Sequence, residues 1–143
     1  MLSLSKHPVG RPHRQTLRCA QGDNIDRLWL CLGAFFALTG MATGAFATHA
    51  LRENAGAVQA FETASRYQIY HALALLLLAA LAPHLGEGVQ LTGWLFVLGI
   101  VLFSGSLYVL GLTGARLTVV VTPIGGVCLL AGWGWLLYQA LRS

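Results

Sequence analysis

The stretch of sequence that decides the fold is YQIYHALALLLLAALAPHL, residues Tyr67–Leu85. A polar and aromatic head comes first, and an unbroken apolar run follows from Ala72 to Ala82. At about 1.5 Å per residue, a helix of this length spans roughly 28 Å, close to the thickness of the hydrocarbon core of a bilayer. A helix of a water-soluble protein needs an apolar surface on one side only, so this stretch predicts a membrane span.

The composition of the whole chain indicates a membrane protein as well. Of its 143 residues, 56% are hydrophobic and only 10% are charged, whereas an ordinary soluble domain has about 25% charged residues. The formal charge of +4 comes mainly from a basic N-terminal tail, so we expect no nucleic-acid partner. The three cysteines show no CxxC or CxxH spacing, and we expect neither a disulfide framework nor a metal or cofactor site.

Four apolar stretches of membrane-spanning length predict an all-α protein, a four-helix transmembrane bundle. An even number of spans places both chain ends on the same side of the membrane. Within the first span, Gly40 and Gly44 form a GxxxG pair, which lets a second helix approach closely. The expected membrane domain covers residues 27–142, with spans at residues 28–48, 67–85, 94–112 and 119–141.

Two segments outside the spans carry weaker signals. Residues 1–26 are basic and without apolar periodicity, so we expect a disordered extension, an upstream start-site choice or a targeting leader. A cleaved secretory signal is a rival interpretation of the first span, but the apolar stretch exceeds the usual length of about 7–15 residues. Between the first two spans, Val58, Phe61 and Ser65 fall on one helical face and predict a short interfacial helix.

The four-span topology collects the polar side chains of the spans in one half of the membrane. Polar groups at membrane depth are costly unless partnered, so they should turn toward one another. Pro123 frees the carbonyl of Val119, which Thr122 can satisfy, and distorts the start of the fourth span. The candidate polar cluster comprises His49, Glu62, Tyr67, Gln68, His71, Ser104, Ser106, Tyr108, Thr122 and Pro123.

Two interpretations of this candidate polar cluster stay open. It is either a small polar site at a distorted helix start, or a set of hydrogen bonds that specifies how the helices pack. Ser104 and Ser106 are two residues apart and therefore point to different faces of one helix. The sequence shows no nucleophile–base pair and no acidic metal cluster, so we do not expect an enzyme.

Four runs of sequence are distinctive: GAFATHAL (Gly44–Leu51), ETASRYQIYHALALL (Glu62–Leu76), LFSGSLYVL (Leu102–Leu110) and RLTVVVTPIGGVCLLAGW (Arg116–Trp133). In this order they resemble the bacterial membrane family called domain of unknown function 423, whose eukaryotic relative is transmembrane protein 256. The resemblance covers about residues 27–142 and implies a small four-span protein of the bacterial inner membrane. It implies no assigned activity, ligand or catalytic residue.

The positions of the basic residues favour cytoplasmic termini by the positive-inside rule, with six on the terminal side and three on the other. Our first functional hypothesis is a structural or interaction protein that packs in the lipid bilayer as a homo-oligomer or against a larger membrane protein. The alternative is a small oligomeric transporter or proton-linked solute-binding protein. It would use His49, His71 and the broken helix start at Pro123.

Overall fold

The computed structural model describes residues 12–85, 88–115 and 118–142, and these residues form four long helices. Each helix contains a segment long and apolar enough to cross a membrane. The described residues contain no strand, so the prediction of an all-α protein with four membrane-spanning helices is confirmed. The helices are α1 (Pro12–Ala50), α2 (Ala55–Leu85), α3 (Gly88–Thr113) and α4 (Thr118–Arg142).

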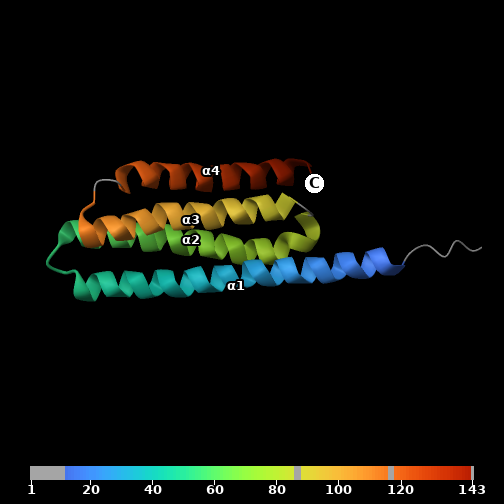
Figure 1. Cartoon of the computed structure of the whole chain (residues 1–143), viewed down its shortest axis with the longest axis horizontal. Helices are drawn as coiled ribbons and strands as arrows, with labels where there is room; N and C mark the ends of the chain where they lie inside the picture. The colour runs from blue at the N-terminus through green and yellow to red at the C-terminus, as the bar shows by residue number, and fades with distance from the viewer. Residues whose placement is uncertain (1–11, 86–87, 116–117, 143) are drawn as a thin grey trace, which may run out of the picture.

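The helices lie side by side in one antiparallel row, in chain order (Figure 1). Helix α1 packs on α2, α2 on α3, and α4 almost entirely on α3. Helices α1 and α4 are therefore the two edges of the row and do not close it into a ring, as they would in a closed bundle. The described start of α1 and the end of α4 lie at the same end of the row, as four antiparallel helices require.

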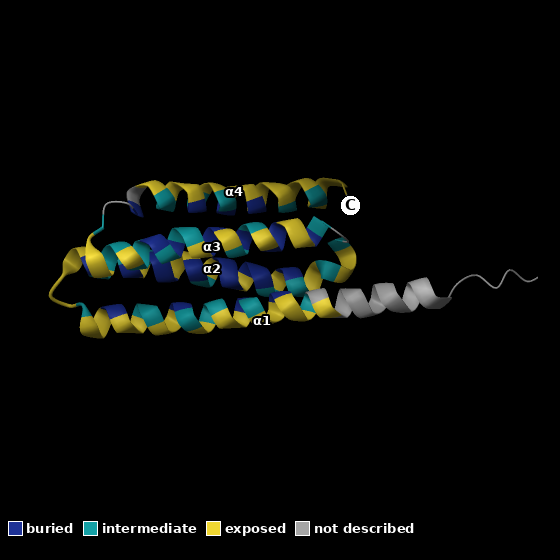
Figure 2. Cartoon of the chain, viewed as in Figure 1, coloured by how far each residue is buried: buried dark blue, intermediate teal, exposed yellow. Residues whose placement is uncertain are grey.

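Burial follows from this arrangement. On α1 and α4 the buried residues are few and face one neighbour, and the other residues are exposed or partly buried (Figure 2). The central helices α2 and α3 are buried on more than one side. The largest apolar cluster lies in the half of the row opposite the candidate polar cluster and consists of Trp29, Ala74, Leu75, Leu78, Val89, Phe96, Ile100 and Leu129.

The predicted short interfacial helix between the first two spans is wrong. Helix α2 begins at Ala55 and runs without interruption into the second span, for 31 residues in all. Asn54 caps it, because its side-chain oxygen accepts a hydrogen bond from the backbone nitrogen of Ala57 at 3.1 Å. After Gly56 in its first turn, α2 contains no glycine or proline until Pro83, and Phe61 and Ser65 are buried against neighbouring helices rather than lying on a membrane surface.

Part of residues 1–26, which we expect to be a disordered or mis-assigned extension, is described as helix. Helix α1 begins at Pro12 and continues through residue 26 into the first span. Proline is well tolerated at the first position of a helix, where its missing N–H would have no helical partner. Residues 1–11 lie outside the described residues, and the choice of start site stays a prediction.

The GxxxG pair of α1 packs against α2, as its spacing predicts. A Cβ added at Gly40 would lie 3.0 Å from Cγ1 of Ile69, and one added at Gly44 would lie 3.2 Å from Oγ of Ser65. These short distances show that the two helix backbones approach closely. Close approach increases van der Waals contact between the helices. In a bilayer this contact drives helix association, because lipid tails are as apolar as the side chains and the hydrophobic effect does not favour helix pairing.

A second close approach joins α3 and α4. A Cβ added at Gly125 would overlap the backbone of Phe103, and one added at Gly132 would lie 2.7 Å from the ring of Phe96. Both glycines are buried, whereas Gly134 on the same helix is exposed and has nothing near its added Cβ. The packing of α4 on α3 therefore depends on glycine at specific positions of α4.

We expect Gly125→Ala to lower the free energy of unfolding by about 1–3 kcal/mol, because α4 must move away from α3. Gly134→Ala is the matched control and should leave this free energy equal or slightly higher, because alanine favours helix and has room there. Denaturant titration of the full chain in detergent micelles, followed by circular dichroism, measures both values. Equal destabilisation by the two substitutions would contradict a tight contact at Gly125.

Candidate functional site

The centre of the polar half is the buried side chain of Gln68 on α2. Its amide nitrogen donates to the backbone oxygen of Phe36 at 2.9 Å and to the hydroxyl of Thr39 at 2.7 Å, both on α1. Its amide oxygen accepts a hydrogen bond from the hydroxyl of Tyr108 on α3 at 2.9 Å. One side chain of α2 thus binds both neighbouring helices.

Tyr108 extends this arrangement back to α1. Its hydroxyl oxygen lies 2.7 Å from the hydroxyl of Thr43, and because the hydrogen of Tyr108 goes to Gln68, Thr43 is the donor. We call these hydrogen-bonded side chains, Thr39, Thr43, Gln68 and Tyr108, the Gln68 network. The network pairs both hydrogens and the oxygen of the Gln68 amide with groups of the protein itself, which a polar side chain at membrane depth requires.

Ser104 and Ser106 face different helices, as their spacing predicts. The hydroxyl of Ser104 donates to the backbone oxygen of Ala64 on α2 at 2.9 Å. The hydroxyl of Ser106 lies 2.7 Å from the hydroxyl of Thr122 on α4. Thr122 also donates to the carbonyl of Thr118 at 2.8 Å. The expected bond from Thr122 to the carbonyl of Val119, which Pro123 frees, stays a prediction.

His71 lies near the middle of α2 and uses both ring nitrogens within the protein. Its Nε2 atom accepts a hydrogen bond from the indole nitrogen of Trp133 on α4 at 3.1 Å. Its Nδ1 atom lies 2.7 Å from the backbone oxygen of Tyr67. Because Nε2 accepts, we assign the hydrogen to Nδ1, and the ring is the neutral tautomer that joins α2 to α4.

A groove of about 440 Å³ lies beside this histidine, between α2, α3 and α4. Tyr67 and His71 on α2, Phe103 on α3 and Trp133 on α4 supply its aromatic wall. The ring of Tyr67 lies 4.9 Å from that of Phe103 and nearly parallel to that of His71, at 6.4 Å between centroids. Pro123 lines the groove together with apolar residues of α4, so this part of the candidate cluster is mainly aromatic and apolar.

The structure does not bring His49 to His71. Facing positions on the antiparallel helices α1 and α2 are matched as Gly40 with Ile69 and Gly44 with Ser65. His49 therefore comes level with about residue 60 of α2, which is roughly 16 Å along the helix axis from His71. His49 and Glu62 are both exposed at that end of the row, so a site that uses both histidines does not form.

Sequence reasoning missed three residues that the structure places in contact with the candidate polar cluster. Thr39 and Thr43 lie one helical turn apart on α1, each next to a glycine of the GxxxG pair. This spacing places both on the face of α1 that packs against α2, and it could have predicted their contact with the cluster. By its sequence position alone, Trp133 is expected to anchor the far end of the fourth span at the membrane interface, as aromatic residues often do. In the structure it instead reaches His71. Among the described residues, no group of three or more metal-ligating side chains is present.

We expect Gln68→Leu to lower the free energy of unfolding by about 1–3 kcal/mol, because Tyr108 and Thr39 lose their partner inside the row. Tyr70→Phe is the matched control, since the side chain of Tyr70 is 57% exposed and takes part in no hydrogen bond within the described chain. Unfolding of both variants in micelles checks the difference. A loss below about 0.3 kcal/mol for Gln68→Leu would show that the Gln68 network does not stabilise the packing.

Trp133→Phe keeps an aromatic ring but removes the donor to His71. We expect a loss of about 0.5–1.5 kcal/mol in the free energy of unfolding, the usual range for one such hydrogen bond. Trp135→Phe, two residues along α4, is the control, since its ring contacts Tyr138 on the same helix and not α2. Unfolding in micelles measures both variants. Equal losses in the free energy of unfolding would argue against a stabilising hydrogen bond between Trp133 on α4 and His71 on α2.

Comparison with known proteins places the chain in a family. Residues 43–126, more than half of the chain, match the family model described as protein of unknown function (DUF423). No solved structure matches.

Relatives from three genera are similar over most of the chain. A UPF0382 membrane protein of Staphylococcus saprophyticus is 41% identical over 109 residues, 75% of this chain and 91% of that protein. The UPF0382 membrane protein YwdK of Bacillus subtilis is 39% identical over 81% of this chain and 98% of its own length. The UPF0382 inner membrane protein YgdD of Escherichia coli K12 is 41% identical over 82% of this chain and 92% of its own length. With four membrane-length helices and these relatives, the chain is an integral, multi-pass membrane protein that belongs to the DUF423 family.

Proposed function

We propose that the protein is a structural or interaction protein of the bacterial inner membrane, without catalytic activity. The observation that carries this proposal is how the buried polar side chains of the polar half are used. Those of the Gln68 network, the two serines of α3 and His71 each bond to another helix of the same chain. Polar side chains that hydrogen-bond to other helices specify how the helices pack, and few of their hydrogen-bonding atoms remain for a substrate.

The alternative, a transporter that uses His49, His71 and Pro123, has less support. The two histidines are roughly 16 Å apart along the helix axis, and both nitrogens of His71 are engaged with Tyr67 and Trp133. A solute path at the midplane of a membrane typically has polar groups that face a shared cavity. The groove beside His71 instead has a mainly aromatic and apolar lining.

The edges of the row are where a partner has room to pack. On α4, the side chains of Val120, Val127 and Leu130 are more than half exposed, and on α1 so are those of Leu38 and Met41. A second copy of this chain or a helix of a larger membrane protein would extend the row by the same kind of pairing that joins its own helices. Lipid covers the faces that no partner takes.

We further propose that both termini lie in the cytoplasm. The start of α1 and the end of α4 share one end of the row, and the sequence concentrates basic residues at that end. By the positive-inside rule this end faces the cytoplasm. The E. coli relative is named an inner membrane protein, which supports the assignment of this chain to that membrane.

A photo-crosslinking amino acid at Leu130, whose side chain is 72% exposed on the edge helix α4, tests the interaction proposal in cells. We expect one discrete crosslinked protein, either a second copy or a larger membrane protein, identified by mass spectrometry. Leu73, which is 54% exposed on the central helix α2, is the matched control and should give markedly less of it.

Crosslinks to lipid alone at both positions would contradict the interaction proposal. So would a proton or solute flux in reconstituted vesicles that His71→Gln abolishes at equal protein level, because that result would establish transport.

A further inference from the structure

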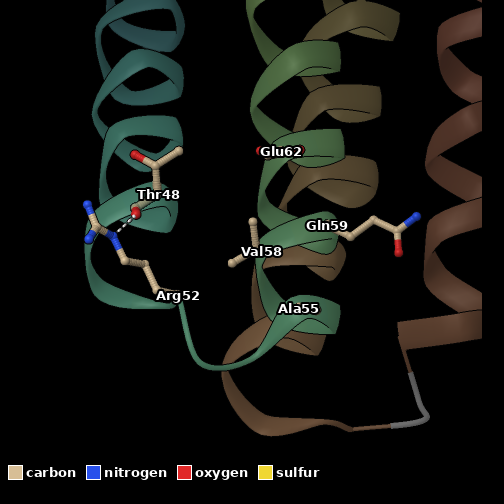
Figure 3. A pocket seen from close by; sticks show the side chains of 6 residues that line it. All are labelled: Thr48, Arg52, Ala55, Val58, Gln59 and Glu62. Carbon is tan, nitrogen blue, oxygen red and sulfur yellow. Dashed lines mark hydrogen bonds between the residues drawn. The ribbon is translucent and has the colours of Figure 1, made fainter.

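A second hollow lies at the start of α2, where the chain turns from α1 into α2 (Figure 3). We call it the interfacial cleft. Its volume is about 450 Å³, within the usual size range of small-ligand sites. The apolar side chains of Ala55 and Val58 form part of its wall, and two opposite charges border it, one from each side of the turn. Its residues are Thr48, Arg52, Ala55, Val58, Gln59 and Glu62.

The cation of the interfacial cleft is Arg52, just past the end of α1. Its Nε atom donates to the backbone oxygen of Thr48 at 2.9 Å, so the side chain folds back along the last turn of α1 (Figure 3). This bond uses one of the five N–H donors of the guanidinium. The two terminal nitrogens have no partner among the described residues, and they keep their four donors for a ligand.

The anion of the interfacial cleft is Glu62, one helix across from Arg52. The match of Gly44 with Ser65 places Thr48, four residues farther along α1, level with residues 61 and 62 of α2. Figure 3 shows the Arg52 guanidinium beside the last turn of α1, about level with Val58, and Glu62 farther along α2, so the two charges border the cleft from different helices. Within the described chain, Glu62 has no partner for this carboxylate, and the two charges do not pair with each other.

This level is the edge of the membrane. The apolar stretch of α1 ends at Thr48, and His49 and Arg52 follow it. Charged groups that sit where the hydrocarbon ends meet the headgroups of phospholipids. A guanidinium suits a phosphate, which accepts several of its donors, and a carboxylate suits a hydrogen-bonding ammonium.

We propose that the interfacial cleft binds a phosphate ester that carries a primary ammonium group, with the phosphate on Arg52 and the ammonium on Glu62. The source we favour is the headgroup of a phosphatidylethanolamine, because Ala55 and Val58 give the cleft an apolar wall for the adjoining part of a lipid. A quaternary ammonium, as in phosphatidylcholine, has no hydrogen to donate to Glu62 and binds less well.

The test is native mass spectrometry of the full chain released from vesicles with equal amounts of phosphatidylethanolamine, phosphatidylcholine and phosphatidylglycerol. The wild-type chain should retain phosphatidylethanolamine about threefold over phosphatidylcholine, the size expected of one exposed charge pair. Glu62→Gln should remove this preference, and Arg52→Gln should lower retention of all three lipids. Arg66→Gln changes the next basic residue of α2, which does not line the cleft, and should leave the preference intact.

Equal retention of the three lipids by the wild-type chain would overturn the proposal, as would loss of the preference in Arg66→Gln. Free phosphoethanolamine without lipid is the second arm. If it binds the wild-type chain and not Arg52→Gln or Glu62→Gln, the site stands with a soluble ligand as its source. Unchanged circular dichroism of the variants shows that lipid retention is compared between folded proteins.

Discussion

A bilayer offers no water to a polar side chain, and the polar half of this protein is arranged to meet that constraint. Gln68 shows it most clearly. Its amide donates two hydrogen bonds to α1 and accepts one from α3 through its oxygen. All three bonds form together only when α1, α2 and α3 are aligned as they are here. A shift of one helix would break several of these bonds at once, and the Gln68 network therefore selects one packing among those that apolar contacts alone would allow.

Close packing in the rest of the row depends on small residues. Glycines of α1 face α2, and glycines of α4 face α3, so the backbones of each pair approach to short distances. The same contacts leave α1 and α4 with one main neighbour each. The bond from Trp133 to His71 is then an important second attachment for α4, because it reaches past α3 to α2. An open row with exposed edge helices is compatible with the proposed pairing with other membrane helices.

The polar features of the row are layered by depth. The interfacial cleft, with its unpaired charges, lies at the level where α1 leaves the apolar stretch, and the Gln68 network lies about two turns deeper. The histidine–tryptophan pair lies deeper still, next to the aromatic groove. The unpaired charges of the interfacial cleft thus lie at the membrane edge, neutral hydrogen bonds lie deeper, and the largest apolar cluster lies in the opposite half. This order follows the falling polarity of the bilayer itself.

The sequence by itself determined the four membrane-spanning helices and their shared polar half. Apolar length is a local property that can be compared directly with bilayer thickness, and helical period alone separates the faces of Ser104 and Ser106. The tertiary structure decided which polar residues meet. Thr39 and Thr43 reach the partners of Gln68, Trp133 reaches His71, and His49 stays apart from it. These pairings depend on the axial register and rotation of one helix against another. Contacts between helices set both, and residue spacing within one helix does not encode them.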